Sequence, residues 1–594
     1  MKLAKVVFAL ATAGIITGVT LTVANAGDEW FDPVLQPGAF CAPRAGGQPA
    51  LLRSLILAKT ETTPFQPVPA QPALAETPRL DPGLGRFHYP IATRDAKVQA
   101  WFNQGMLLAF GFNHAEAQRA FREAQKIDPA CAMCYWGEAL VLGPNINVPM
   151  MPEAIAPANA AIEKAVMLSG TASAREQALI AALRQRYSAD PKAERAALDR
   201  AYARAMGEVA ARYPKDDTIK VLHAEAIMDT QPWDYWEAAG TKPKGDAGKA
   251  VAALEEVIAR NPRHAGAAHL YIHAMEASAR PEKALPAARR LADLAPGAGH
   301  LVHMPAHIYY RLGMYRESLE INKRAIEVDE RYFAASPSDP LYKTAYYPHN
   351  IHFVMVSAQM AGDGATAVMA ARKLDASIPV EVAKMFAIVQ PVKAAPYTTH
   401  AQFGDAASIL ALPAPAQELL LVKAMYHYSR AVAHAMRKDV AAARAEIASL
   451  ERLEREGDFK PFAEWQVPAK EVVQTARLVA LGRLADAQGD LEGAAKAYED
   501  AIFIEDTLAY MEPPYWYYPI RQSLGSVRMR QGRLDEAEKA FRDSLARVRS
   551  NGWALAGLAE TYKLKGNDRA ERATRKALAK AWLGEGAGPD PAKL

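Results

Sequence analysis

The chain has 594 residues, far more than one hydrophobic core usually organises, so it must contain several domains or an array of repeats. Lys and Arg total 70 against 66 Asp and Glu, which gives a net charge of +4. That balance excludes a protein that binds nucleic acid or a membrane surface through bulk charge. Ala is abundant and alternating β-branched residues are scarce, so the composition predicts an all-α fold.

Residues 1–26 have the three parts of a secretory signal peptide. A basic start is followed by an apolar run from Val6 to Val23 and by Ala-Asn-Ala, which ends at Ala26. We predict cleavage after Ala26, a secreted or periplasmic mature protein, and no stable membrane span after cleavage. The alternative, an uncleaved membrane anchor, is disfavoured by the glycines and threonines within the apolar run.

Residues 27–95 are rich in Pro and Gly and cannot hold a regular helix. We predict that this segment is a linker or wraps around the rest of the chain.

From Trp101 onward the sequence becomes periodic. Small and aromatic residues recur at the spacing of a helical hairpin, at Trp101, Gly105, Leu108, Ala117, Phe121, Ala124 and Pro129. Similar patterns recur at 489–501 and 525–541, and Pro262 and Pro296 are 34 residues apart. This segment resembles a tetratricopeptide repeat (TPR), a 34-residue pair of helices. Phrases such as Cys131–Glu138 are also similar to those of a group of secreted bacterial TPR proteins.

The resemblance implies a solenoid of helical hairpins, a superhelix with a concave groove. We assign residues 96–378 to an N-terminal TPR array with a His-lined groove and residues 379–594 to a C-terminal TPR array. Insertions interrupt the repeat period at 231–248, 332–343 and 379–415, and the last two are predicted to hinge the halves or cover the groove.

Seven histidines keep one register through three consecutive units. The spacings from His269 to His303 and from His273 to His307 are both 34 residues, the length of one repeat. In the TPR family, the second, fifth, ninth and twelfth positions of a unit face the groove. The resemblance therefore implies that one groove is lined by Glu276 and by His269, His273, His300, His303, His307, His349 and His352.

Neutral imidazoles on adjacent helical turns, with a carboxylate one turn further, are typical ligands for a transition metal. We predict copper or zinc, with iron as a third choice, and Glu276 as a fourth ligand or as a catalytic base on a bound water. Two other interpretations remain open. The histidines are ordinary hydrogen-bonded polar side chains, or, when protonated, they bind an anionic peptide or small acid.

Cys131 and Cys134 form a C-x-x-C motif at a predicted helix start. Such a motif is a redox dithiol, half of a metal site or a local disulfide. For an exported protein, a disulfide or redox pair is the preferred interpretation.

The sequence contains no Walker loop, GxGxxG, GxSxG or HExxH motif, so nucleotide binding and serine hydrolysis have no support. The leading hypothesis is an exported TPR solenoid that binds a transition metal, and whether it is also an enzyme stays open. The alternative is a metal-free periplasmic scaffold whose groove takes a small molecule, a peptide or an envelope protein.

Overall fold

The computed structural model describes residues 78–190, 192–237, 240–335, 340–508 and 510–594. The predicted signal peptide, with its cleavage site, lies outside the described residues, as does most of the predicted wrap.

The described end of the predicted wrap, residues 78–95, contains no helix and lies against the helical body. The Tyr89 hydroxyl donates to Asp216 Oδ2 at 3.1 Å, and the Ala92 backbone N–H donates to Glu176 Oε1 at 2.6 Å. This segment is therefore fastened to the first helices by polar contacts.

Regular structure in the described residues is helical, apart from one isolated β-bridge between Trp236 and Pro243. The first helices are α3 (Ala96–Phe110), α4 (His114–Ile127), α5 (Ala132–Leu142), α6 (Ile155–Leu168), α7 (Ala174–Arg184), α8 (Arg195–Arg212), α9 (Asp217–Thr230) and α10 (Ala247–Arg260). The middle helices are α11 (Ala265–Glu276), α12 (Leu285–Leu294), α13 (Gly299–His303), α14 (Pro305–Arg311), α15 (Tyr315–Ala335), α16 (Pro340–Ala361) and α17 (Gly364–Ser377). The short helices that follow are α18 (Val380–Met385), α19 (Gln390–Lys393), α20 (Ala395–Phe403) and α21 (Ala406–Leu410). The last helices are α22 (Leu420–Met436), α23 (Val440–Glu456), α24 (Lys460–Glu464), α25 (Ala469–Ala487), α26 (Leu491–Glu505), α27 (Ile520–Arg530), α28 (Leu534–Arg547), α29 (Gly552–Leu564) and α30 (Asp568–Ala581).

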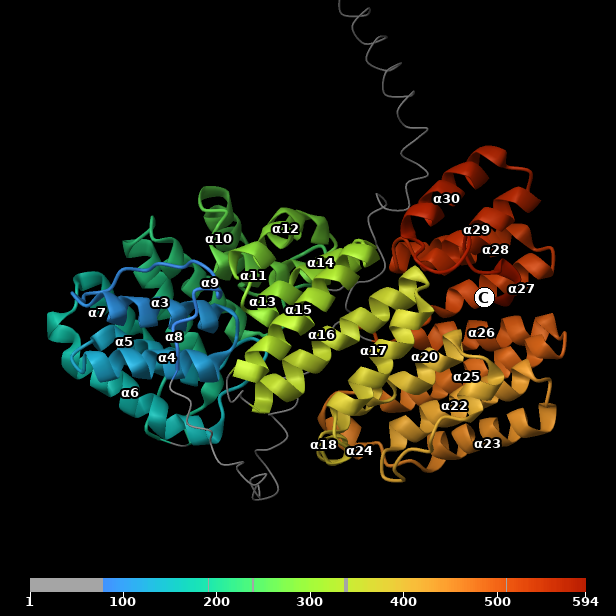
Figure 1. Ribbon diagram of the computed structural model, residues 1–594, viewed down its shortest axis with the longest axis horizontal. Helices are drawn as coiled ribbons and strands as arrows, with labels where there is room; N and C mark the ends of the chain where they lie inside the picture. The colour runs from blue at the N-terminus through green and yellow to red at the C-terminus, as the bar shows by residue number, and fades with distance from the viewer. Residues whose placement is uncertain (1–77, 191, 238–239, 336–339, 509) are drawn as a thin grey trace, which may run out of the picture.

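Most of these helices pair with their sequence neighbours as antiparallel hairpins, and the hairpins stack side by side into a TPR-like superhelix (Figure 1). One packing motif shows the repeat at both ends of the chain. The ring of Phe121 lies where a Cβ on Gly105 or Gly137 would stand, and the ring of Phe541 does the same at Gly525 and Gly557. Removing two Cβ atoms lets three neighbouring helices close around one aromatic ring.

Seven of the hairpin turns have a left-handed residue that ends the first helix. Five of these turns use glycine with positive φ, at Gly313, Gly362, Gly489, Gly532 and Gly566. Two turns use other residues, Phe112 with φ 56° and Lys438 with φ 57°.

The last helices, at the upper right of Figure 1, are bonded to the turn ends of the middle helices. The Trp553 indole N–H donates to the Gln359 carbonyl at 2.8 Å, and the Leu583 N–H donates to the Ala361 carbonyl at 2.7 Å. The Tyr315 hydroxyl donates to the Arg549 carbonyl at 2.7 Å. These contacts fix the turn ends of α14 to α17 against the last hairpins.

Two predicted loops are largely helical. Residues 380–410 form α18 to α21, and α20 packs between α17 and α22, so this region continues the stack rather than covering a groove. Residues Tyr332–Ala335 extend α15, and Pro340–Lys343 begin α16.

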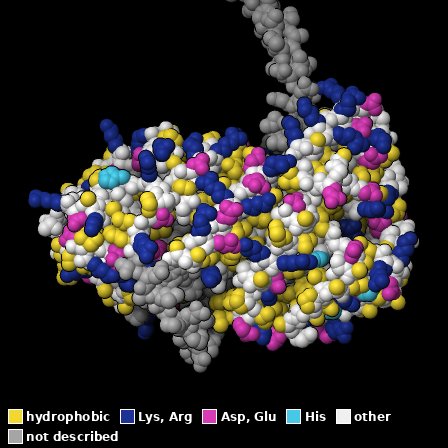
Figure 2. All heavy atoms as spheres, viewed as in Figure 1, with side chains coloured by type: hydrophobic (Ala, Val, Ile, Leu, Met, Phe, Trp, Pro, Cys, Tyr) yellow, Lys and Arg dark blue, Asp and Glu magenta, His cyan; other side chains and the backbone are white. Residues whose placement is uncertain are grey.

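On the face shown in Figure 2, Lys and Arg are interspersed with Asp and Glu, as the near balance of charge leads one to expect. Among the described helices, none combines the length and the apolar character that a membrane crossing requires.

Candidate metal centre

Four helices bring histidines to one buried cluster, the histidine cluster, made of His269 and His273 from α11, His300 and His303 from α13, His307 from α14 and His349 from α16. Five of these side chains are at most 2% exposed, and His349 is half-buried. The register predicted from the repeat therefore brings six of the seven histidines together. They lie in the interior of the superhelix instead of lining an open groove.

The histidine cluster divides into two groups of three, in each of which one nitrogen per ring lies within 4.8 Å of the others. The first group is His269, His273 and His300, and the second is His303, His307 and His349. The Nε2 atoms of His269 and His300 are 3.1 Å apart, and those of His303 and His307 are 2.9 Å apart. Two nitrogens on one tetrahedral zinc ion are about 3.4 Å apart. Each group is therefore geometrically compatible with a metal ion.

Hydrogen bonds from outside the cluster orient one ring in each group. His269 Nδ1 lies 2.6 Å from the Phe110 carbonyl oxygen, and His303 Nδ1 lies 2.6 Å from Asn322 Oδ1. Because both oxygens only accept, each Nδ1 carries the proton and each Nε2 presents a lone pair to the cluster. Metal-binding histidines in proteins are commonly held by such a bond on the other ring nitrogen.

Glu276, the predicted fourth ligand or base, lies between the two groups. Its Oε2 is 2.9 Å from His307 Nδ1 and 3.9 Å from His273 Nδ1, and neither approach has hydrogen-bond geometry. Glu276 is fully buried, and burial raises its pKa to about 8, opposed by the nearby Arg311 guanidinium. The side chain approaches Nδ1 of His307, whose Nε2 faces the cluster, so it is placed to orient that ring.

A second carboxyl group, that of Glu512 in the C-terminal half, lies near Glu276. Glu512 precedes α27, and its Oε2 accepts a hydrogen bond from the Tyr510 hydroxyl at 2.7 Å. Burial, and to a smaller extent the charge of Glu276, raise the pKa of Glu512 to about 8. No local sequence pattern reveals which residues the loop that carries Tyr510 and Glu512 meets in space.

Burial lowers the pKa of every histidine in the cluster below its ordinary value, for His269 and His307 to about 3. For most of them, repulsion between neighbouring imidazoles adds to this desolvation. The rings are therefore neutral at physiological pH, which is the state that coordinates metals. Binding of an anion by protonated imidazoles, one of the interpretations open from sequence, is disfavoured.

Aromatic side chains close the first group. The ring centroid of Phe112 lies 4.5 Å from that of His269, and Trp233 lies 5.0 Å from His273. Both Phe112 and Trp233 have positive φ, 56° and 65°, a conformation that bulky residues rarely adopt. Asn147 connects Trp233 to α16, because its side chain accepts from the Trp233 indole N–H at 3.1 Å and donates to the Tyr346 hydroxyl at 3.4 Å.

His352, the seventh predicted histidine, belongs to neither group. Its Nε2 lies 2.8 Å from the hydroxyl of Tyr517, in the loop before α27.

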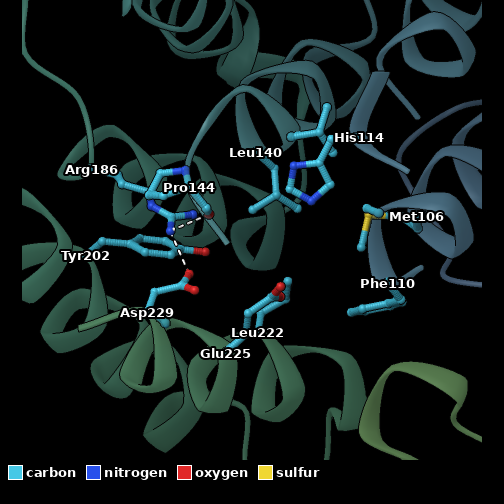
Figure 3. Close-up of a pocket in the computed structure, with 13 residues that line it drawn as sticks. Met106, Phe110, His114, Leu140, Pro144, Arg186, Tyr202, Leu222, Glu225 and Asp229 are labelled. Atoms are coloured by element: carbon cyan, nitrogen blue, oxygen red, sulfur yellow. Dashed lines mark hydrogen bonds and ion pairs between the residues drawn. The ribbon is translucent and has the colours of Figure 1, made fainter. Parts of the chain in front are cut away.

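A separate cavity lies beside α9 and is lined by Arg186, Glu225 and Asp229 together with apolar side chains (Figure 3). Arg186 donates to Asp229 Oδ2 at 2.6 Å and to the Pro144 carbonyl at 2.9 Å. The other carboxylate oxygen of Asp229 has no hydrogen-bond partner. The space available is about 10 Å³, enough for one water molecule.

Cys131 and Cys134 are joined by a disulfide at the start of α5, and both are buried. Cys131 is the N-cap residue of this helix, and its sulfur accepts from the Cys134 N–H at 3.2 Å. The buried bond fixes the first turn of α5, and a redox role for the pair stays a prediction.

Comparisons with known proteins concern the repeat fold. Residues 98–131 match the family model of the tetratricopeptide repeat. No curated protein sequence matches the chain. Among solved structures, a human IFIT1 dimer with m7Gppp-AAAA is 14% identical with a TM-score of 0.31, over 81% of this chain and 97% of that chain. Yeast Tom70 is 12% identical with a TM-score of 0.25, over 80% of this chain and 90% of that chain. Residues 98–131 thus match a tetratricopeptide repeat, and the described residues around them form an all-helical, TPR-like superhelix of hairpins.

Proposed function

We propose that this chain is an exported TPR-like protein that binds a transition metal in the histidine cluster. The observation that carries the proposal is the pair of three-histidine groups, each buried and each with Nε2 atoms 2.9 to 3.4 Å apart. Burying six imidazoles without a ligand leaves several ring nitrogens without hydrogen bonds, including both of His273. Each such atom costs about 1–3 kcal/mol, and a metal ion bound by His273 would recover that loss for one of its two nitrogens.

The donor set restricts the metal. Three neutral imidazoles in each group suit copper, zinc or iron, and the cluster offers no thiolate. The bonds to His269 and His303 would hold Nε2 toward the ion, and Glu276 would orient His307. Reaction chemistry at the ion would need access for a substrate, so metal binding is the part of the hypothesis with direct geometric support.

A second function, binding of a peptide or small molecule, is favoured by one pocket outside the cluster. It has a volume of about 650 Å³ and is lined by Arg79, Gln104, Glu116, Arg119 and other residues of 78–84, α3, α4, α15 and α16. Ligand pockets in proteins commonly have volumes of 300–1,000 Å³. Its lining offers both signs of charge, which suits a polar ligand.

Metal content distinguishes the two functions. The exported protein is purified without a His tag, and bound metals are measured by elemental analysis. We expect a stoichiometric transition metal that is lost in the double variant His269→Ala, His303→Ala. Background metal in the wild type, with thermal stability unchanged by a chelator, would favour the metal-free scaffold.

A further inference from the structure

Resting on the proposed function, we infer that the centre holds two metal ions, one on each three-histidine group. The two groups are the same site repeated by one unit of the superhelix.

The correspondence between the groups is set by the repeat. In each group, one unit supplies two histidines that are one helical turn apart, and the next unit supplies the third histidine. His269 and His273 on α11 correspond to His303 and His307 on α13 and α14, each shifted by 34 residues. The third members, His300 and His349, both lie three residues before the next histidine of their own unit.

The contacts within the two groups correspond in part. The first histidine of each pair is oriented through Nδ1 by an oxygen acceptor 2.6 Å away, the Phe110 carbonyl for His269 and the Asn322 amide for His303. The closest second nitrogen differs between the groups: His269 meets Nε2 of His300, the third member, at 3.1 Å, whereas His303 meets Nε2 of His307, its partner in the pair, at 2.9 Å. The correspondence therefore covers the residue types and the orientation of the first histidine, but not the closest pair within each group.

The series of sites stops after two for local reasons. On one side, the position equivalent to His300 is Gly266, where a Cβ would lie only 2.5 Å from Phe110 Cδ1. On the other side, His352 occupies the place of His303, but the residue one turn later is the fully buried Val356. Neither neighbouring unit can therefore complete a third group.

The two groups are adjacent. Ring centroids are 6.0 Å apart between His300 and His303 and also between His273 and His307. Glu276 Oε2 lies nearest to one ring of each group, His307 and His273. One carboxyl group thus lies beside a histidine of each group, between the two proposed ions.

The test is a zinc titration of the full-length mature protein after chelator treatment, with a chromophoric chelator as competitor. Three variants are compared with the wild type: His300→Asn in the first group, His349→Asn in the second, and His352→Asn as control. His352 lies on the same helix as His349, three residues away, and bonds Tyr517 instead of the cluster. Circular dichroism of the zinc-free proteins checks that each variant folds, and a two-step titration of the wild type supports the inference even if one variant does not.

We expect two equivalents of zinc in the wild type and in His352→Asn, and one in each of the other variants. One equivalent in the wild type would overturn the two-ion inference but leave the proposed function standing. Loss of both equivalents in a single variant would show one shared site and also overturn it. No zinc above background in the wild type would overturn the proposed function itself.

Discussion

At the scale of single residues, Phe112 shows how the site is embedded in the repeat. It occupies the left-handed turn position that glycine fills in five other hairpins, although that conformation costs an L-residue about 1–2 kcal/mol. Its ring contacts three histidines of the first group, His269, His273 and His300. Backbone strain and a contact with the centre therefore coincide at one residue, as is common at functional sites.

Replacing Phe112 with glycine removes both the strain and the ring, and the same replacement at Lys438 shows the part that is due to strain. Phe112→Gly removes the strain, but it also removes a ring that is 4% exposed, and deleting a buried Phe ring costs about 3–5 kcal/mol. We expect a net loss of about 2 kcal/mol in the free energy of unfolding by urea, together with weaker zinc binding at the first group. Lys438→Gly is the matched control, since Lys438 has the same turn conformation and is exposed. It should stabilise the protein by about 0.5–1 kcal/mol without changing zinc affinity, and an equal response of both variants would contradict a role for the Phe112 ring.

At the scale of elements, α9 carries two acidic side chains one turn apart toward the cavity of Figure 3. Burial raises the pKa of Asp229 to about 7 and that of Glu225 to about 8, and the two titrate as a pair. The Arg186 guanidinium opposes both shifts. The helix therefore holds carboxyl groups that bind protons more tightly in the folded state than in the unfolded state.

That difference fixes the sign of a pH dependence. Between about pH 5 and pH 8 the unfolded carboxylates have lost their protons while the folded ones still bind them, so the free energy of unfolding falls as pH rises. Glu225→Gln should flatten this slope and stabilise the protein at pH 8 by about 1 kcal/mol or more relative to pH 5. Urea unfolding at both pH values measures the effect. Glu208→Gln, exposed on α8, controls for the loss of one surface carboxylate, and a similar slope change there would count against the cavity as the cause.

At the scale of the whole molecule, periodicity predicts the helical hairpins and most of the histidine cluster, but it wrongly includes His352 and wrongly predicts an open groove. The apolar period predicts the hairpins, and the 34-residue spacing from His269 to His303 places six histidines in one cluster. Contacts between distant segments were not predictable. Tyr517 contacts His352, which is 165 residues away in the sequence. Glu512 lies near Glu276 because the C-terminal segment packs against the middle helices. The burial of the first histidine group could not be predicted either. Phe112 and Trp233 cover that group from turns whose backbone conformation no repeat pattern encodes.

The position of the centre predicts which part of the superhelix depends on metal. Repeat proteins gain stability mainly from interfaces between neighbouring units, so a bound ion should stabilise the units that supply its ligands and those packed on them. Those units span α11 to α16, whereas α22 and α23 supply no ligand to the histidine cluster.

At a free metal concentration of 1,000 times the Kd, binding adds about 4 kcal/mol to the stability of the bound state. Hydrogen exchange measured by mass spectrometry, before and after chelator treatment, should therefore show lost protection across 265–361 and little change across 420–456. Readding zinc should restore protection in the wild type but not in the variant His269→Ala, His303→Ala. Uniform loss along the chain would instead indicate that the chelator acts on the fold as one cooperative unit, and no change anywhere would mean that the histidine cluster holds no stabilising ion.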